Sequence, residues 1–481
     1  MSNIKNLGKE VIIYGLGHFL ARFLNFLLLP IYTNSLEPHS FGIITLLFAF
    51  IAFSNILFVH GMDVSFMRFF GLEKDTDIKK ILFSTSLSSV FMSSFILGCI
   101  YYYSSDTIAE LTIGVQYNNL IRLSIFIIIA DAFISIPKVL LRLQNKPYYF
   151  IFLEMIHVII VLILNIWWIG IKGLSIDYIF FSNLIASLIV CLISFFFIRK
   201  YFSLRLSLPK WNELIIFAIP YIPAGFASII NELIDRYMIK WLVDEKAVGL
   251  YASSYKLGIF MLVLVTSFKF AWQPFFLKQA DNKNAPKVFA TIGTYFLIIS
   301  FYLLLVISFF INYLVQFSFF GISLINQNYW SSLDIVPIVL LAYIVLGVFI
   351  IQIPGIYIKK KNNWIPILNC SAAIINVTAN FIFIPFYGYK FAALATLIGY
   401  SCMVILQYFV INKFYEIQWE WYRLSFIIFL FIILFSFWKL SGDNPIIGLL
   451  NLVAYPFLLY FLPFFNNKEK EKLKTFIFIA N

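Results

Sequence analysis

The sequence predicts an all-α, polytopic membrane protein with about 14 transmembrane helices. Its 481 residues are 62% hydrophobic and only 12% charged, and its mean hydropathy is +0.91. Soluble proteins carry roughly 25% charged residues. Apolar segments follow one another from Val11 to Phe465, which excludes a soluble enzyme held by a single membrane anchor.

Apolar runs of about 20 residues, bounded by polar residues or by Gly, Pro and Asn, define the individual helices. The first run begins at Val11. It is longer than the apolar part of a cleaved signal peptide, so we expect it to remain as the first helix. The expected helices are 11–36, 41–60, 81–103, 119–142, 148–170, 176–198, 213–243, 247–276, 288–315, 333–358, 364–384, 391–412, 424–440 and 444–465.

Lysine and arginine residues set the expected orientation of these helices. One alternate set of loops, together with both termini, holds 24 of them. The opposite set holds only 5, namely Lys172, Lys240, Lys246, Lys390 and Lys439. Cytoplasmic loops are enriched in positive charge, so we expect both termini in the cytoplasm. This bias explains the net charge of +12 and leaves no reason to expect a nucleic-acid partner.

Nothing in the sequence indicates an enzyme. The longest loops, 61–80 and 316–332, are too short for a catalytic domain. The chain has no phosphate-binding glycine loop, no metal-spaced histidine pair and no nucleophile elbow. The four cysteines lie in apolar helices without a metal-binding spacing. We therefore expect no cofactor and no metal.

The chain contains a weak internal repeat. Residues 36–43 match residues 243–250 at an offset of 207, and a second match at an offset of 215 aligns Asn165 with Asn380. Six helices separate the copies, so both insert in the same orientation and are related by an axis along the membrane normal. We expect two six-helix lobes, 1–205 and 206–415, in parallel pseudo-twofold repeat. Residues 416–481 add two helices and a basic cytoplasmic tail.

The seventh helix carries a group of charges that is rare in a membrane segment. Glu232, Asp235 and Arg236 lie at spacings i, i+3 and i+4 and therefore share one helical face. Each ionisable group at membrane depth costs roughly 2.5 to 3.5 kcal/mol on insertion scales, so such groups usually face a protein interior or a watery cavity. The cluster predicts a pathway for a charged cargo.

Several short motifs together carry a family resemblance. They are Pro30–Leu36 with Phe41-Gly42, Leu141–Lys146, Ile219-Pro220 with Asp235–Tyr237, Val248–Tyr251 with Tyr255–Leu257, and Asn376–Ala395. In these motifs, over essentially its whole length, the chain resembles polysaccharide flippases of the multidrug/oligosaccharidyl-lipid/polysaccharide exporter superfamily. The resemblance implies two six-helix lobes, often with two further helices. It also implies outward movement of undecaprenyl-diphosphate-linked sugar units through the bacterial cytoplasmic membrane, for an O-antigen of lipopolysaccharide, a capsule or a similar polymer.

A diphosphate cargo requires cations, and arginine suits it through its planar fork of donors. The candidates within helices are Arg22, Arg236, Lys256 and Lys269. Arg22 shares a polar face with His18 and Asn25 and resembles in position a cavity arginine of lipid II flippases; a structural ion pair is the alternative. Arg236 either contacts substrate or is neutralised by its neighbouring acids. Lys256 has no acid in its own helix, whereas Lys269 is close enough to the cytoplasmic end to reach the interface.

Acids and amides complete the candidate site. Asp131 and Glu154 are isolated acids, and Glu154 shares a face with His157. These three residues, with Glu232 and Asp235, are candidates for proton or sodium coupling or for gating; interhelical hydrogen bonding is the alternative. Asn369, Asn376 and Asn380 form a stripe on the eleventh helix that either binds sugar hydroxyls or joins helices.

Two other functions remain open. A cation-coupled drug or metabolite antiporter of the same superfamily predicts an apolar cavity with few cations, which four helix-embedded cations disfavour. A membrane glycan polymerase predicts a long, charged outward loop, but residues 316–332 include no charged side chain. For a flippase we expect lipid-linked glycan and membrane lipid as ligands, and glycan polymerase and glycosyltransferases as partner proteins. Its energy comes from the membrane potential or from an ion gradient.

Overall fold

The all-α polytopic architecture is confirmed. A computed structural model describes residues 17, 19–144, 146–203, 205–280, 282–319, 321–465, 467 and 469–471. Within these ranges, twelve helical segments are long and apolar enough to cross a membrane, and the shorter apolar helix Pro445–Phe461 follows them. The first expected span, 11–36, lies partly outside the described residues, but residues 19–26 are helical. The chain is therefore a multi-pass membrane protein.

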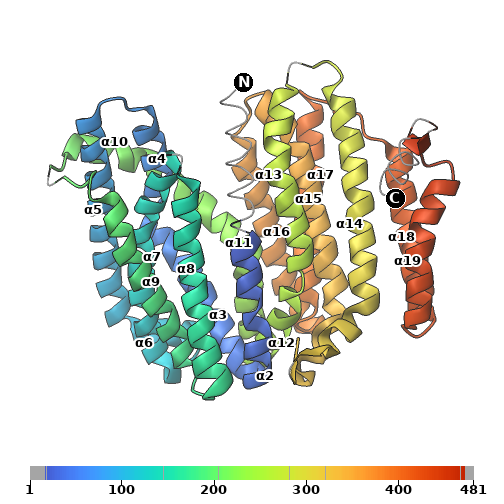
Figure 1. Cartoon of the computed structure of the whole chain (residues 1–481), viewed down its shortest axis with the longest axis horizontal. Coiled ribbons are helices and arrows are strands. Elements are labelled where there is room, and N and C mark those ends of the chain that lie inside the picture. Colours follow the sequence, from blue (N-terminus) through green and yellow to red (C-terminus); the bar gives the residue numbers. More distant parts are fainter. Residues whose placement is uncertain are drawn as a thin grey trace. The chain divides into compact units, whose positions relative to one another are not determined.

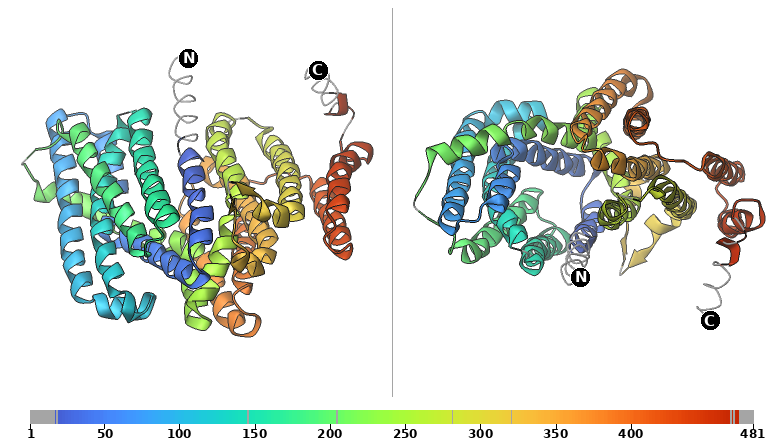
Figure 2. Two further views of the ribbon diagram at one scale, coloured as in Figure 1. Left: turned by 60° about the horizontal axis from the view of Figure 1, so that its bottom comes forward. Right: turned by 90° about the horizontal axis from the view of Figure 1, so that it is seen from above.

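The described residues fall into two compact units. The first comprises those up to Leu257, together with Ser318–Ser332 and Asn363–Met403. Its helices α5, α7, α8 and α9 run side by side (Figures 1 and 2). Its elements are α2 Leu28–Ser35, α3 Pro38–Val59, α4 Met62–Leu72, α5 Thr76–Tyr103, α6 Ser105–Thr112, η1 Val115–Tyr117, α7 Asn118–Leu143, α8 Pro147–Asn165, η2 Ile166–Ile171, α9 Asp177–Ile198, α10 Leu208–Ala218, α11 Tyr221–Leu242, α12 Glu245–Lys256, the strands β1 Ser318–Phe319 and β2 Ile322–Ser323, and α16 Trp364–Tyr387.

The second unit holds the remaining helices. In it α18 and α19 form a two-helix hairpin that packs against α14 (Figure 2). Its helices are α13 Ile259–Lys278, α14 Ala285–Gln316, α15 Val336–Ile358, α18 Trp421–Leu440 and α19 Pro445–Phe461. The 3-10 segment η3 Gln327–Ile335 and helix α17 Phe391–Asn412 each contribute residues to both units.

Two expected helices are each divided in two. The sequence 213–243 remains one candidate membrane span, Leu208–Leu242, with its break at a proline, whereas the continuity expected for 247–276 was wrong. The expected helix 213–243 is α10 and α11, with a turn at Ile219 and Pro220, because proline cannot donate a backbone hydrogen bond inside a helix. The expected helix 247–276 is α12 and α13, with the break at Leu257 and Gly258. Glycine lowers helix propensity by about 1 kcal/mol relative to alanine.

The two copies of the first sequence repeat pack against each other. Helices α3 and α12 cross so closely that a Cβ on Gly42 would lie 1.9 Å from the Glu245 carbonyl oxygen. A Cβ on Gly249 would lie 1.8 Å from the Pro38 carbonyl oxygen. The offset of 207 that relates Gly42 to Gly249 also relates Pro38 to Glu245, so the two contacts are reciprocal. Local pseudo-twofold symmetry therefore holds at this crossing.

The two compact units do not divide at residue 205. Helices α11 and α12 pack on α3, and α11 also packs on α16, so the first unit extends to Leu257. The lobes 1–205 and 206–415 were inferred from the sequence repeat. They remain a prediction of two repeated halves and do not coincide with the compact units.

Candidate functional site

The centre of the candidate site is the ammonium group of Lys256 at the end of α12. Its Nζ atom lies 5.1 Å from the ring centroid of Phe41 and 5.8 Å from that of Tyr32, both within the range of cation–π attraction. Within the described part of the chain it forms no ion pair or hydrogen bond. The side chain is half-buried. Lys256 is therefore a cation whose charge no acid neutralises.

The aromatic rings around Lys256 are themselves held in place. The Tyr32 hydroxyl donates a hydrogen bond to Oδ1 of Asn165 at 3.0 Å. The Phe41 ring meets the Tyr329 ring edge-on at a centroid distance of 5.9 Å, and the Tyr329 hydroxyl donates to the Leu36 carbonyl at 2.9 Å. Tyr329 belongs to the 3-10 segment η3 before α15 and is fully buried. Residues far apart in the sequence thus fix the walls around Lys256.

Arg236 and Asp235 form a buried pair beside this lysine. Arg236 Nη1 donates to Asp235 Oδ1 at 2.6 Å, and the two side chains are only 8% and 3% exposed. Arg236 Nη1 also donates to the Glu232 carbonyl, and the Tyr251 hydroxyl donates to Asp235 Oδ2. The Arg236 guanidinium lies 4.6 Å from the Tyr255 ring centroid. Asp235 therefore pairs with Arg236 and is held by Tyr251 at the same time.

The charges here sum to a positive value. Asp235 and Arg236 cancel as a pair, and the Arg236 guanidinium is near enough to Lys256 for the like charges to repel. One uncompensated positive charge remains among these three residues, in aromatic surroundings. Such a place attracts an anion and repels a cation.

The other expected substrate-binding cations lie in different surroundings. Arg22 is exposed and forms no ion pair or hydrogen bond with another described residue. Lys269 is also exposed, on α13 in the second unit. Glu232 is exposed as well, although its backbone carbonyl accepts from Arg236 Nη1 one turn further along the same helix. Glu232 lies three positions before Asp235, which leaves Glu232 toward the edge of the buried face.

The asparagine stripe on α16 joins helices in this conformation. Asn376 and Asn380 are 2% and 0% exposed. Nδ2 of Asn380 donates to Oδ1 of Asn376 at 2.8 Å, and Nδ2 of Asn376 donates to Oγ1 of Thr396 on α17 at 3.2 Å. Asn369 is half-buried and accepts through its carbonyl from Asn231 on α11 at 2.9 Å. Of the three, Asn369 is the least enclosed.

A second polar cluster joins α7, α8 and α9. The Ser187 hydroxyl donates to Oδ1 of Asp131 at 2.6 Å and lies 3.3 Å from Nε2 of His157. Nζ of Lys138 lies 2.6 Å from Oε1 of Glu154. The expectation that Asp131 and Glu154 are isolated was therefore wrong. Lys138 sits two turns from Asp131 on α7, a cation that the sequence reasoning overlooked.

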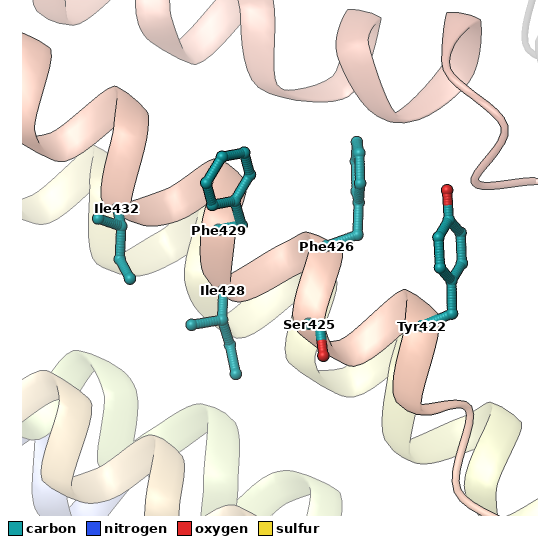
Figure 3. Close-up of a pocket in the computed structure, with 6 residues that line it drawn as sticks. All are labelled: Tyr422, Ser425, Phe426, Ile428, Phe429 and Ile432. Carbon is teal, nitrogen blue, oxygen red and sulfur yellow. The ribbon is translucent and has the colours of Figure 1, made fainter.

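An apolar groove on the second unit contains none of the expected site residues. It has a volume of about 550 Å³ and is lined by Tyr422, Ser425, Phe426, Ile428, Phe429 and Ile432 of α18. The rings of Phe426 and Phe429 project from one side of the helix, and Ser425 and Ile428 point to the other (Figure 3). No charged group lines the groove, so it suits hydrocarbon rather than an anionic head group. Across the described residues, no group of three or more His, Cys, Asp or Glu side chains is placed to hold a metal ion.

A comparison of the sequence with models of known protein families identifies the family of this chain. Residues 7–280 match the family model described as polysaccharide biosynthesis protein. The chain belongs to this family. No curated protein sequence matches it. The resemblance to polysaccharide flippases noted from the motifs is thus confirmed at the level of the family.

Solved structures show which fold this polysaccharide biosynthesis protein has. It is similar to the lipid II flippase MurJ in an inward closed conformation, with a TM-score of 0.76 and 16% identity over 93% of this chain and 99% of that chain. It is also similar to an inward-facing multidrug resistance MATE family transporter of the MOP superfamily, with a TM-score of 0.65 and 13% identity over 82% and 94% of the two chains. A MOP superfamily transporter from Pyrococcus furiosus gives a TM-score of 0.60 at 12% identity, over 84% and 95%. The shared feature is the fold.

Sequence reasoning missed the residues that complete each cluster in this family member. Tyr32, Tyr251 and Tyr255 surround the charges near Lys256, and Ser187 connects Asp131 with His157. Tyr251 and Tyr255 lie five residues and one residue before Lys256, in the motifs Val248–Tyr251 and Tyr255–Leu257. Ser187 gave no signal, because buried serines are frequent in membrane helices and usually join neighbouring helices.

Proposed function

We propose that this protein flips undecaprenyl-diphosphate-linked oligosaccharide repeat units from the cytoplasmic to the outer leaflet by alternating access. The cargo belongs to surface polysaccharide synthesis, as an O-antigen, capsule or similar polymer. The protein works in the bacterial cytoplasmic membrane with both termini in the cytoplasm, and its partner proteins are a glycan polymerase and glycosyltransferases. It is a transporter without enzymatic activity.

One observation carries the proposal: Lys256 is a half-buried cation without an acid partner among the described residues. A diphosphate is a multivalent anion that lysine binds as a point charge through its three donors. The neighbouring Arg236 is already paired with Asp235, so it adds its field and orients the site. Arg22, exposed on the first helix, offers a second cation for the same cargo.

The polar head and the hydrocarbon tail of such a cargo take different routes across the membrane. The polyprenyl chain stays in lipid, which needs no polar protein surface, while the diphosphate and sugars cross a hydrated path. Moving one elementary charge across 100 mV corresponds to about 2.3 kcal/mol, and an inside-negative potential favours outward movement of an anion. The potential alone is therefore an adequate source of energy, and ion coupling adds to it.

The test combines a glycan-display assay with a drug-efflux assay in the source cell. Deletion of the gene should remove the surface glycan and leave lipid-linked repeat units in the inner leaflet. Lys256→Ala and Arg22→Ala should reproduce this loss at normal protein level. Lys246→Ala is the matched control, because Lys246 is an exposed lysine on the same helix α12. Normal glycan display in the deletion strain, with increased drug sensitivity, would support the antiporter instead.

A further inference from the structure

The cluster between α7, α8 and α9 contains a chain of hydrogen bonds with titratable groups at both ends. Ser187 Oγ stands 2.6 Å from Asp131 Oδ1 and 3.3 Å from His157 Nε2. Asp131 comes from α7, His157 from α8 and Ser187 from α9. Ser187 is fully buried. The three helices thus meet at a single hydroxyl group.

The hydroxyl group has only one proton, and this sets the direction of both hydrogen bonds. When Asp131 is ionised it can only accept, so Ser187 donates to it and His157 Nε2 must donate to Ser187. When Asp131 is protonated, both bonds are able to reverse, with Asp131 donating to Ser187 and Ser187 donating to His157. The two arrangements use the same atoms and differ in the position of the protons.

We propose that Asp131, Ser187 and His157 form a proton relay that couples proton movement to transport. This rests on the proposed flippase function. His157 Nδ1 takes a proton from water, giving the imidazolium. Its Nε2 proton then passes to Ser187 Oγ while the Ser187 proton passes to Asp131 Oδ1. The products are a neutral His157 protonated on Nδ1 and a protonated Asp131, so one proton has been taken up.

Proton uptake changes the net charge of the group formed by Asp131, His157, Lys138 and Glu154. Lys138 on α7 and Glu154 on α8 form a pair at 2.6 Å and cancel each other. With His157 neutral and Asp131 ionised, the network of four carries one net negative charge. Uptake of one proton brings the net charge to zero. A net charge buried among membrane helices is costly, so proton uptake alters the free energy of this three-helix contact.

The other charged groups on α7 and on the short helices that pack on it lie near the ends of α7 or on those short helices: Arg122 and Arg142 on α7, Asp63 and Arg68 on α4, and Asp106 and Glu110 on α6. Helix α9 has Asp177 at its first residue, two to three turns from Ser187, and α2 has no charged residue. On α5, which packs on α7, the charges Asp77, Lys79 and Lys80 lie in the first turns. Arg22 on the first helix is exposed. On the side toward Lys138, an apolar cluster of Ile134, Leu141, Phe150, Leu153 and Val190 lies between the three helices.

The donor set suits a proton rather than a sodium ion. Hard cations take about six oxygen ligands. Here one carboxylate and one hydroxyl face a ring nitrogen, and the second carboxylate is bound to the Lys138 ammonium. An ammonium beside the site also repels a metal cation. Proton transfer, in contrast, needs only donors and acceptors in hydrogen-bond contact, which the carboxylate, the hydroxyl and the imidazole provide.

The test uses the full-length protein in vesicles of phosphatidylethanolamine and phosphatidylglycerol, with a pH-sensitive dye inside and undecaprenyl diphosphate as the cargo probe. Valinomycin with equal potassium on both sides removes the membrane potential. Cargo-dependent proton movement is expected with the wild type. Ser187→Ala should lower it by at least about tenfold, because the variant lacks the hydroxyl that joins His157 to Asp131 and so loses two hydrogen bonds of the relay. Ser187→Thr keeps the hydroxyl and should restore most of the flux.

The matched control is Ser194→Ala. Ser194 is buried two turns further along α9, and among the described residues its hydroxyl bonds only to the Cys191 carbonyl of its own helix. Its proton movement should equal that of the wild type. If undecaprenyl diphosphate crosses with wild-type protein but without proton movement, the relay is wrong and the flippase proposal stands. If the cargo does not cross at all, the proposed function itself is contradicted. Equal loss in Ser187→Ala and Ser194→Ala also overturns the relay.

Discussion

Replacement of Lys256 by alanine should weaken binding of a diphosphate lipid much more than it weakens the fold. A hydrogen bond to a charged group contributes about 1.5 to 3 kcal/mol, which corresponds to a loss of roughly 10- to 150-fold in affinity at 1.36 kcal/mol per factor of ten. The fold loses only the cation–π contacts with Tyr32 and Phe41, about 0.5 to 2 kcal/mol together. No acid is left unpaired, because Lys256 pairs with none among the described residues.

Arg236→Ala should behave in the opposite way and so provides an internal comparison. Removing this guanidinium leaves the carboxylate of Asp235, which is 3% exposed on its side chain, without its cation. Breaking a buried pair by removing one partner costs about 3 to 5 kcal/mol. The melting temperature should therefore fall strongly in Arg236→Ala and only slightly in Lys256→Ala.

Two measurements on the same purified protein check this contrast. Calorimetric titration with undecaprenyl diphosphate in detergent gives the affinity, and thermal unfolding gives the stability. Lys256→Arg retains the charge and should bind within about tenfold of the wild type, since one displaced hydrogen bond costs about 1.4 kcal/mol. Lys246→Ala, on the exposed part of α12, should match the wild type in both. Wild-type affinity in Lys256→Ala would refute the reasoning.

Three further predictions concern other parts of the structure. Gly42→Ala and Gly249→Ala should each lower the free energy of unfolding by about 1 to 3 kcal/mol or more and impair transport, since the added Cβ meets a carbonyl of the crossing helix. The control is Gly170→Ala, whose Cβ would meet Ile31 at an ordinary 3.6 Å. Its melting temperature should equal that of the wild type. Asp235→Asn and Tyr251→Phe share one hydrogen bond, so a double-mutant cycle should give a coupling of about 0.5 to 3 kcal/mol, and additive losses would contradict the shared bond. Arg423→Ala removes contacts to Glu420 at 3.1 Å and Glu469 at 2.5 Å and should cost about 1.5 to 3 kcal/mol in unfolding, whereas the exposed Lys439→Ala, whose pair with Asp443 is also exposed, should leave the melting temperature unchanged.

The sequence determined the class, the helices and the family. Lipid offers no hydrogen-bond partners to the backbone, so each apolar run of sufficient length must be a helix. This is why composition and period alone located the spans. Pro220 interrupts its helix because it has no N–H to donate, whereas the break at Gly258, inside an apolar run, was not expected. The motifs also identified the family, because a motif such as Val248–Tyr251 needs no knowledge of its neighbours in space.

The tertiary structure decided which charged residues are paired and which are not. The sequence shows that Arg236 has acids beside it and that Lys256 has none in its own helix, but only the structure shows that Arg236 pairs with Asp235 and that Lys256 faces aromatic rings. Glu154 was isolated along the chain and is paired with Lys138 on another helix. Electrostatic energy depends on distances of a few ångström between helices, and a helical period fixes only the face of one helix, not which residue of another helix it meets.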